Sequence, residues 1–318
     1  MNIQTLILFC TIAIPTCNPV ELKGPVVNKV KEFDSYWNQG KAEITSYDLY
    51  QARYGEMREG VAHIIFVTEE ISKEKQVKLD NPNIPPDQKM TVLKMNMVKK
   101  FQTGIYPYSM MLSSYVQTAG VAPWQAIKLS MSCQEWCGHV FSQLNLKPDH
   151  YDFQSHSYFE SEDEIKKKID RFTTEDAIWN LIRVNPDALI QSDSIMIIPG
   201  LLFSRLSHKE VKPYRASTKK IELDEGTLLY HIEYPSLGRS LAIEYEPAFP
   251  YTILKWTEEY IDGFGKDAKL LTTTAVRKKS ILLDYWNRHK NADSTLIPEL
   301  EWVVPFADTS AIRVSDNL

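Results

Sequence analysis

Apolar and polar residues alternate with a period of two through most of the chain from about residue 41 to 275, most clearly at 93–98, 228–234 and 241–246. Because successive side chains of a β-strand point to opposite faces of the sheet, this period indicates strands. Turn residues at 54–60, 224–226 and 235–238 lie between such runs, a spacing typical of antiparallel hairpins. The residues expected on the buried face are Leu93, Met95, Met97, Tyr230, Ile232, Ile243 and Tyr245.

This pattern predicts a mainly β fold, built as a large antiparallel curved sheet or barrel of lipocalin-like or lipoprotein-carrier-like type. We expect only a few short helices, at 26–37, 161–169 and 173–183. In the last of these, Thr173 and Asp176 have the spacing of a capping box, and the apolar residues that follow have helical spacing.

The chain contains two similar stretches, "IYPYSMM" at 105–111 and "AFPYTIL" at 248–254. Two interpretations follow: two related β units, or chance similarity between two aromatic-rich strands. The expected organisation is a signal segment at 1–17, an N-terminal linker and helix at 18–40, a first β unit at 41–160, a helical connection at 161–192 and a second β unit at 193–318, continuous or not with the first.

The N-terminus carries no charged side chain before Glu21. Its apolar run, Leu6 to Ile14, is shorter than the about 20 residues that a spanning helix needs, and fits the apolar region of a secretory signal. Cys17 follows this run, as in bacterial lipoprotein signals, and is the expected lipidation site. The alternatives are ordinary secretion with cleavage nearby and a buried N-terminal segment. We therefore expect an exported protein, either an outer-membrane lipoprotein facing the periplasm or a soluble periplasmic protein.

The charge pattern argues against nucleic-acid binding. The 318 residues carry a formal net charge of -5. The short basic runs at 166–168 and 277–279 have acidic neighbours, whereas nucleic-acid binding uses a concentrated basic face.

The stretch "SMSCQEWCGH" at 130–139 places Cys133 and Cys137 four residues apart, next to His139. Strand-like alternation on both sides indicates that "QEWCG" bends a hairpin. The two cysteines are then structural thiols or, in an oxidising compartment, a local disulfide. A metal site and a redox site are the other interpretations. Zinc usually takes four ligands from two close pairs, and this stretch offers one pair.

A second candidate is "HYDFQSH" at 150–156, where a strand would place His150, Asp152 and His156 on one face. These three residues are either weak metal-ligand candidates or the polar side of an amphipathic strand. The sequence lacks the G-x-S-x-G serine-hydrolase motif and both common glycine-rich phosphate-binding motifs. We therefore assign no catalytic residue and expect no cofactor.

Three stretches, 36–60, 132–145 and 272–289, resemble a family of uncharacterised exported proteins and lipoproteins of Bacteroidota. Members often carry the label "septum formation inhibitor Maf". True Maf proteins are cytoplasmic nucleotide pyrophosphatases that open with a Ser-x-Ser-Pro-Arg-Arg motif, which is absent from this sequence, so the label is misapplied. The resemblance implies an envelope location and a β architecture, and supplies no catalytic residues.

The expected function is non-catalytic binding of an apolar small molecule or lipid in the periplasm, with a lipid anchor as the link to the membrane. A curved sheet with an apolar face can enclose such a ligand. One alternative is an accessory subunit of an outer-membrane protein complex. The other is an enzyme, either a metal-assisted hydrolase or a nucleotide pyrophosphatase.

Overall fold

The computed structural model describes residues 30–118, 126–162 and 164–301. Strands dominate these residues, and short 3-10 helices such as Pro235–Leu237 and Gly265–Asp267 occupy several connections. The helices are α1 (Val30–Trp37), α2 (Glu175–Val184) and α3 (Leu201–Leu206). The strands are β1 (Ala42–Arg53), β2 (Glu56–Ser72), β3 (Lys89–Thr103), β4 (Tyr106–Gln117), β5 (Ala126–Glu135), β6 (Gly138–Leu146), β7 (His150–Ser157), β8 (Ile165–Asp170), β9 (Thr173–Thr174), β10 (Ser192–Ile198), β11 (Tyr214–Glu222), β12 (Leu228–Tyr234), β13 (Arg239–Tyr245), β14 (Ile253–Asp262) and β15 (Lys269–Leu283).

All fifteen strands belong to one sheet, in the order β8-β7-β6-β5-β4-β3-β2-β1-β15-β14-β13-β12-β11-β10-β9. Every neighbouring pair in this order is antiparallel except β9 and β10, which are parallel. The strands from 41–160 and those from 193–318 meet where β1 pairs with β15, in a register that runs from Ala42 opposite Leu283 to Tyr50 opposite Thr274. The two expected β segments therefore share a single hydrogen-bonded sheet.

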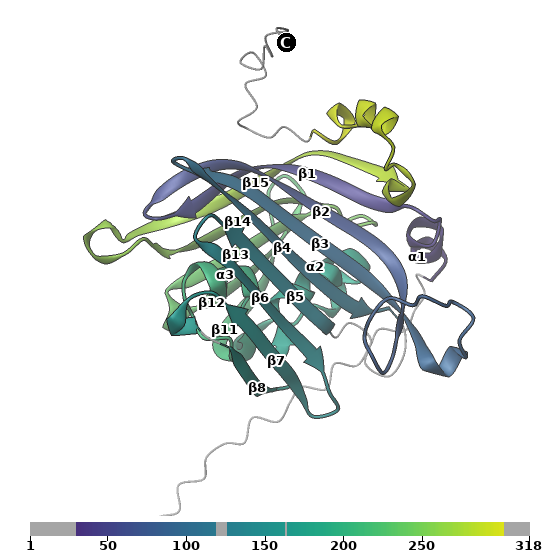
Figure 1. The fold of residues 1–318 in the computed structure, drawn as a ribbon, viewed down its shortest axis with the longest axis horizontal. Helices are drawn as coiled ribbons and strands as arrows, with labels where there is room; N and C mark the ends of the chain where they lie inside the picture. The colour runs from purple at the N-terminus through teal and green to yellow at the C-terminus, as the bar shows by residue number, and fades with distance from the viewer. Residues whose placement is uncertain (1–29, 119–125, 163, 302–318) are drawn as a thin grey trace, which may run out of the picture.

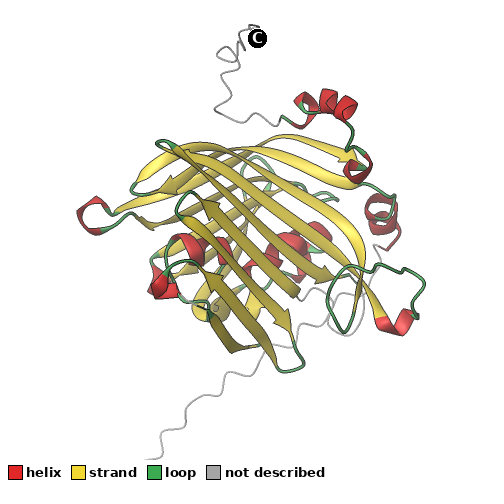
Figure 2. Cartoon of the chain, viewed as in Figure 1, coloured by secondary structure: helices red, strands yellow, loops and turns green. Residues whose placement is uncertain are grey.

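The sheet is strongly curved and open, and it wraps around α2 and α3 (Figure 1). Long strands twist, and a register shift between Ser46 and Tyr47 adds a local bend where β1 meets β15. Figure 2 shows the two helices in the interior, behind the front strands. In α2, Trp179 packs edge-on against Trp256 of β14 with ring centroids 5.3 Å apart, and Asn180 Nδ2 donates to the Leu93 carbonyl of β3 at 2.8 Å. The helix thus bridges both arms of the curve.

The mainly β, antiparallel and curved architecture predicted from the sequence is confirmed. The seven residues expected on the apolar face are all buried in one hydrophobic core. This core fills the inside of the curve, where the sheet side chains meet α2 and α3. Among the described residues, no helix is long and apolar enough to cross a lipid bilayer.

The sequence prediction was wrong in two local places. The expected helix at 161–169 is instead largely strand β8, which pairs with β7 in a register that sets Lys167 opposite Phe153. The capping box of Thr173 and Asp176 does not form, because residues 173–174 pair with β10 and the helix begins only at Glu175. In both cases strand pairing outweighs a local helical signal. The first expected helix is present as α1, and residues 26–29 of that prediction lie outside the described residues.

Candidate functional site

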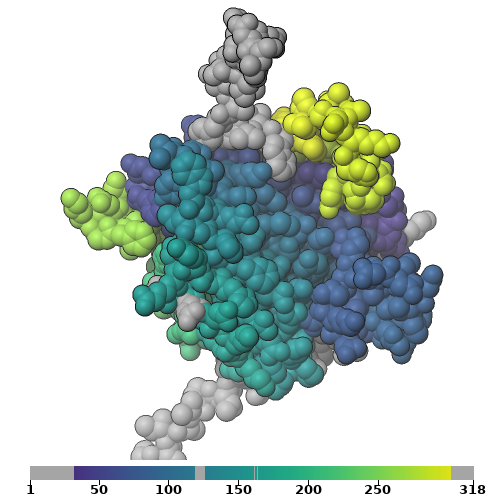
Figure 3. All heavy atoms as spheres, viewed as in Figure 1, coloured from purple at the N-terminus to yellow at the C-terminus, as the bar shows by residue number. Residues whose placement is uncertain are grey.

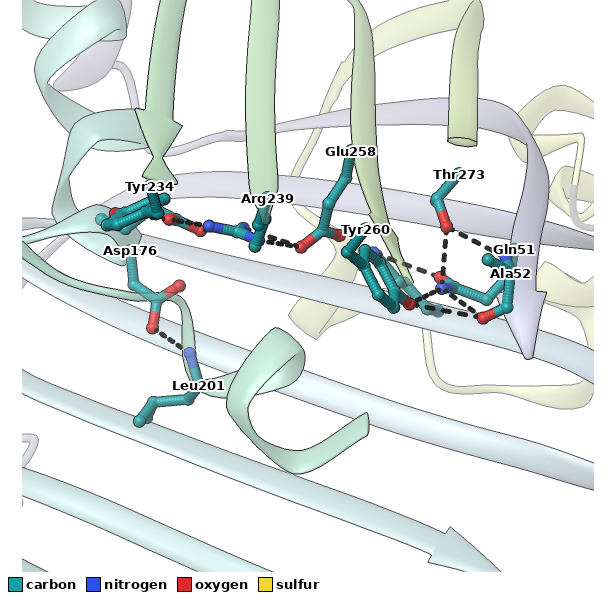
Figure 4. A network of polar contacts seen from close by, with 11 residues as sticks. Gln51, Ala52, Asp176, Leu201, Tyr234, Arg239, Glu258, Tyr260 and Thr273 are labelled. Atoms are coloured by element: carbon teal, nitrogen blue, oxygen red, sulfur yellow. Dashed lines mark hydrogen bonds and ion pairs between the residues drawn. The ribbon is translucent and has the colours of Figure 1, made fainter. Parts of the chain in front are cut away.

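Ionised side chains lie inside the curve of the sheet, where apolar ones were expected. Arg239 of β13 and Glu175 at the start of α2 form a bidentate pair, with both N–O distances at 2.6 Å. Arg239 also donates to Glu258 Oε1 from Nε and Nη2, at 2.9 and 2.7 Å, and Tyr234 Oη donates to Glu175 Oε2 at 2.8 Å (Figure 4). The Arg239 guanidinium lies 4.2 Å from the centre of the Phe203 ring of α3. This cluster therefore fastens both interior helices to β12–β14.

Asp176 continues the cluster on the side of α3. Its Oδ2 accepts a hydrogen bond from the Leu201 backbone N–H at 3.0 Å, which caps α3 (Figure 4). Burial, reinforced by the charge of Glu175, raises the pKa of the Asp176 carboxyl to about 8. Lys99 of β3 is also buried, and its burial lowers the pKa of the ammonium group, against the pull of Glu258. Lys99 Nζ donates to Gln51 Oε1 at 3.4 Å.

A second buried ion pair holds the other end of α2. Arg183 makes a bidentate contact with Glu43 of β1, and its Nε donates to the Pro250 carbonyl at 2.9 Å. Tyr36 Oη of α1 donates to Glu43 Oε2 at 2.5 Å. Burial opposes ionisation of Glu43, but the Arg183 charge and hydrogen bonds outweigh it and hold the pKa of Glu43 below its usual value. Ion pairs and hydrogen bonds therefore fix both ends of α2. Buried charges are strongly destabilising unless they are paired and hydrogen-bonded in this way.

These buried groups bond mainly to one another, so their geometry fits a structural role. A different feature is open to a ligand. A cavity of about 290 Å³ lies between α3, the segment after it and the inner face of β5–β8. Its apolar walls come from Met131, Val140, Phe153, Ile165, Leu201 and Val211, and its polar lining from Ser142, Ser155, Glu162, Lys167, Ser204, Arg205, His208, Lys209 and Glu210.

Among the described residues of this lining, one buried side-chain polar atom lacks a partner. Ser204 Oγ is buried, and no described residue hydrogen-bonds to it. Most buried polar atoms in proteins are hydrogen-bonded, so Ser204 Oγ is an unsatisfied group just behind the cavity wall, which a ligand oxygen would reach if the neighbouring side chains shift. Ser142 and Ser155, by contrast, bond to each other across β6 and β7 at 3.0 Å.

The charged residues of the cavity lining, which we call the rim, pair with one another. Arg205 Nη1 contacts Glu162 Oε2 at 2.7 Å, and His208 Nδ1 contacts the other oxygen of Glu162. Partial burial opposes ionisation of Glu162, but the His208 hydrogen bond and the Arg205 charge prevail and lower the pKa of Glu162. Lys167 Nζ contacts Glu210 Oε1 at 2.7 Å. With Lys209 included, the rim holds more basic than acidic side chains, an excess that favours an anionic group.

The cysteine stretch bends a hairpin, as predicted. Glu135 pairs with Gly138, and Trp136 and Cys137 form the turn between β5 and β6. Cys133 is buried and Cys137 exposed, and both thiols are free. Burial raises the pKa of the Cys133 thiol, whereas a hydrogen bond with Glu135 raises that of Cys137. His139 is exposed on β6.

The candidate metal ligands lie on β7, whose Tyr151 and Phe153 face the core. His150 contacts Asp152 Oδ1 at 3.0 Å, but His156 turns to Glu164 at 3.4 Å. The structure thus does not join the three predicted residues in one site. No group of three or more His, Cys, Asp or Glu side chains in residues 30–118, 126–162 and 164–301 could hold a metal ion. Cys17, the expected lipidation site, lies outside the described residues.

Sequence reasoning missed the interior charges and the cavity. Glu175, Asp176 and Arg183 look like the solvated face of an amphipathic helix, yet all ten residues of α2 are buried. Helical periodicity reveals a polar face but not the second arm of a sheet that covers it. A signal was available in the four-residue spacing of Leu201 and Arg205, which points apolar and basic groups to one side of a short helix.

No family model matches the chain, and no curated protein is detectably similar to it. Among solved structures, the chain is similar to a β-barrel-like protein of domain of unknown function DUF1849 from Brucella abortus. The TM-score is 0.43 and the identity 7%, over 76% of this chain and 98% of that one. Aeromonas veronii immune modulator A aligns with a TM-score of 0.14 and 9% identity, over 75% and 94% of the two chains.

Proposed function

We propose that this protein binds, without chemical turnover, a small amphiphile with an apolar chain and an acidic head group. The cavity beside α3 carries the proposal, because it joins apolar walls to an orphan Ser204 hydroxyl and a rim rich in basic groups. The chain would lie against Met131, Phe153 and Leu201, and the head group would exchange with Glu162 as the partner of Arg205.

The size of the cavity limits the ligand. A volume of about 290 Å³ equals the space of about ten water molecules in the liquid, at about 30 Å³ each. A saturated chain of about ten carbons is therefore a suitable probe. Burying about eight methylenes gains about 6 kcal/mol, and a charged hydrogen bond adds about 2 kcal/mol. After an association cost of about 4 kcal/mol, about 4 kcal/mol remains, so we expect a Kd of about 1 mM for decanoate.

Isothermal titration calorimetry with decanoate, below its micelle concentration, tests the proposal. Ser155→Phe should fill the cavity and weaken binding at least about tenfold. Ser132→Phe is the matched control, because Ser132 lies on the same region of the sheet but is neither buried nor part of the cavity lining. Decanol, which lacks the charge, should bind more weakly than decanoate. Equal binding to the parent and to a folded Ser155→Phe variant would refute the proposal.

The proposal also places the protein in the cell envelope, anchored through Cys17. The apolar run from Leu6 to Ile14 that ends near this cysteine supports an export signal. Labelled palmitate should enter the parent protein but not Cys17→Ser. Palmitate incorporation that survives the substitution, or a mature protein that begins elsewhere, would contradict the lipid anchor. Neither result would bear on the ligand-binding proposal.

A further inference from the structure

The most exposed apolar side chains of the described residues gather at one end of the sheet. The antiparallel order brings several turns to this end, which we call the turn end. It consists of residues 54–55 (β1–β2), 104–105 (β3–β4), 136–137 (β5–β6) and 263–268 (β14–β15), the start of the β7–β8 loop at Tyr158, and the adjoining strand residues Ile261 and Leu270. In Figure 3 the β14–β15 turn, coloured yellow-green, stands out from the body at the left.

Exposure separates this end from the rest of the molecule. Large apolar side chains elsewhere in the described residues are less than half exposed, the highest being Tyr50 at 48%. At the turn end the exposed fractions are 79% for Ile105, 75% for Tyr158, 70% for Trp136, 63% for Ile261, 60% for Phe264 and 60% for Leu270. Single exposed apolar residues are ordinary, but six at one end mark an interaction surface.

The turn end is held in place by its own contacts. The Tyr106 and Trp136 rings are 6.3 Å apart, and the Tyr54 and Phe264 rings are also 6.3 Å apart. The Gly55 N–H donates to Asp262 Oδ1 at 2.7 Å, which joins the β1–β2 turn to the last residue of β14. Trp136 and Phe264 are therefore held against neighbouring rings, so they lose less ordering entropy when they bind.

The turn end adjoins the lining of the cavity. His208 lines the cavity and contacts Glu162 of the β7–β8 connection. The His208 ring is also 5.9 Å from the Phe264 ring. A molecule held against the turn end would therefore lie beside the cavity wall at His208.

We propose that the turn end docks on a lipid bilayer, with Ile105, Trp136 and Phe264 inserted at the interface. Tryptophan and tyrosine rings suit the membrane–water boundary, where one edge is apolar and the other hydrated. The side chains stand on separate turns, so each can enter the lipid on its own. The β3–β4 turn carries no charge from Gln102 to Tyr106, which favours insertion over purely electrostatic adsorption. A protein partner is the competing occupant. The inference does not depend on the ligand proposal, because docking needs no occupied cavity.

Flotation with phosphatidylcholine vesicles, with no added ligand, tests this inference. All proteins carry Cys17→Ser so that no acyl chain is attached there. The test variant adds Ile105→Ser, Trp136→Ser and Phe264→Ser. Each lost side chain should lower the partition coefficient about threefold to tenfold, so the triple variant should bind at least about thirtyfold more weakly.

The matched control adds Val77→Ser, Ile221→Ser and Ile297→Ser, three exposed apolar residues away from the turn end. It should bind vesicles like the parent, in 0.15 M and in 1 M NaCl alike. Residues 1–29 are identical in all three proteins, so any contribution they make cancels. A parent that does not bind vesicles would overturn the inference in favour of a protein partner. Equal binding by the test variant and the parent would also overturn it.

Discussion

Replacing Asp176 by Asn should change how stability depends on pH. The Asp176 carboxyl is buried beside Glu175, within the field of Arg239 and Glu258, and its pKa is raised to about 8 from an ordinary value of 3.8. Between these two values the folded state binds a proton that the unfolded state releases. Stability must therefore fall as pH rises through this window, since the folded protein is the more protonated form.

The size of the effect follows from the shift. One pKa unit corresponds to about 1.36 kcal/mol, so the three units from pH 5 to 8 give a ceiling of about 4 kcal/mol. Relaxation and water penetration reduce such values in real proteins, and we expect about 2 kcal/mol. Asn does not titrate and keeps an oxygen that can accept the Leu201 N–H. The stability of Asp176→Asn relative to the parent should thus grow by about 2 kcal/mol from pH 5 to pH 8.

Urea unfolding followed by tryptophan fluorescence at pH 5, 6, 7 and 8 measures the difference between the two proteins. Other titrating groups, such as His63, are common to both and cancel in that difference. Two parallel stability curves would refute the reasoning, because they would mean that Asp176 is ionised in the folded state throughout.

Three further outcomes follow from the packing. Gly60→Ala should destabilise the fold by about 1–3 kcal/mol, because an added Cβ would lie 2.4 Å from the Lys100 carbonyl oxygen. The control is Gly138→Ala, whose added Cβ meets only the Tyr158 side chain; an equal shift of the urea midpoint in both variants would argue against backbone crowding at Gly60. Iodoacetamide should modify Cys137 in the folded protein and spare Cys133, and peptide mapping that finds both labelled at equal rates would contradict the burial of Cys133. Arg239→Met should cost about 3–5 kcal/mol because it leaves Glu175 and Glu258 buried without their partner, and thermal melting unchanged within about 1 kcal/mol would show that the cluster does not hold the helices.

The sequence predicts the fold class because strand periodicity is local. Alternation alone predicts that one strand face is buried at Tyr230, Ile232, Ile243 and Tyr245, and all four residues are buried. Strand β8 was misread since its lysines look solvated in any conformation, and only its pairing with β7 decides the outcome.

The interior is less predictable, because it depends on contacts far apart in the sequence. Glu43 and Arg183 are 140 positions apart, and nothing near either residue indicates the other. The cavity depends likewise on the approach of α3 to β5–β8. Period-two alternation says that a strand has a buried face, but not whether a helix, a ligand or another strand covers it.

A crystal structure of the protein grown with decanoate would test the central claim most directly. We predict electron density for an acyl chain between Phe153, Met131 and Leu201, with the carboxylate close to Ser204 Oγ and the Arg205 guanidinium. Density for decanoate only at other positions, with the cavity beside α3 empty at saturating ligand, would contradict the account.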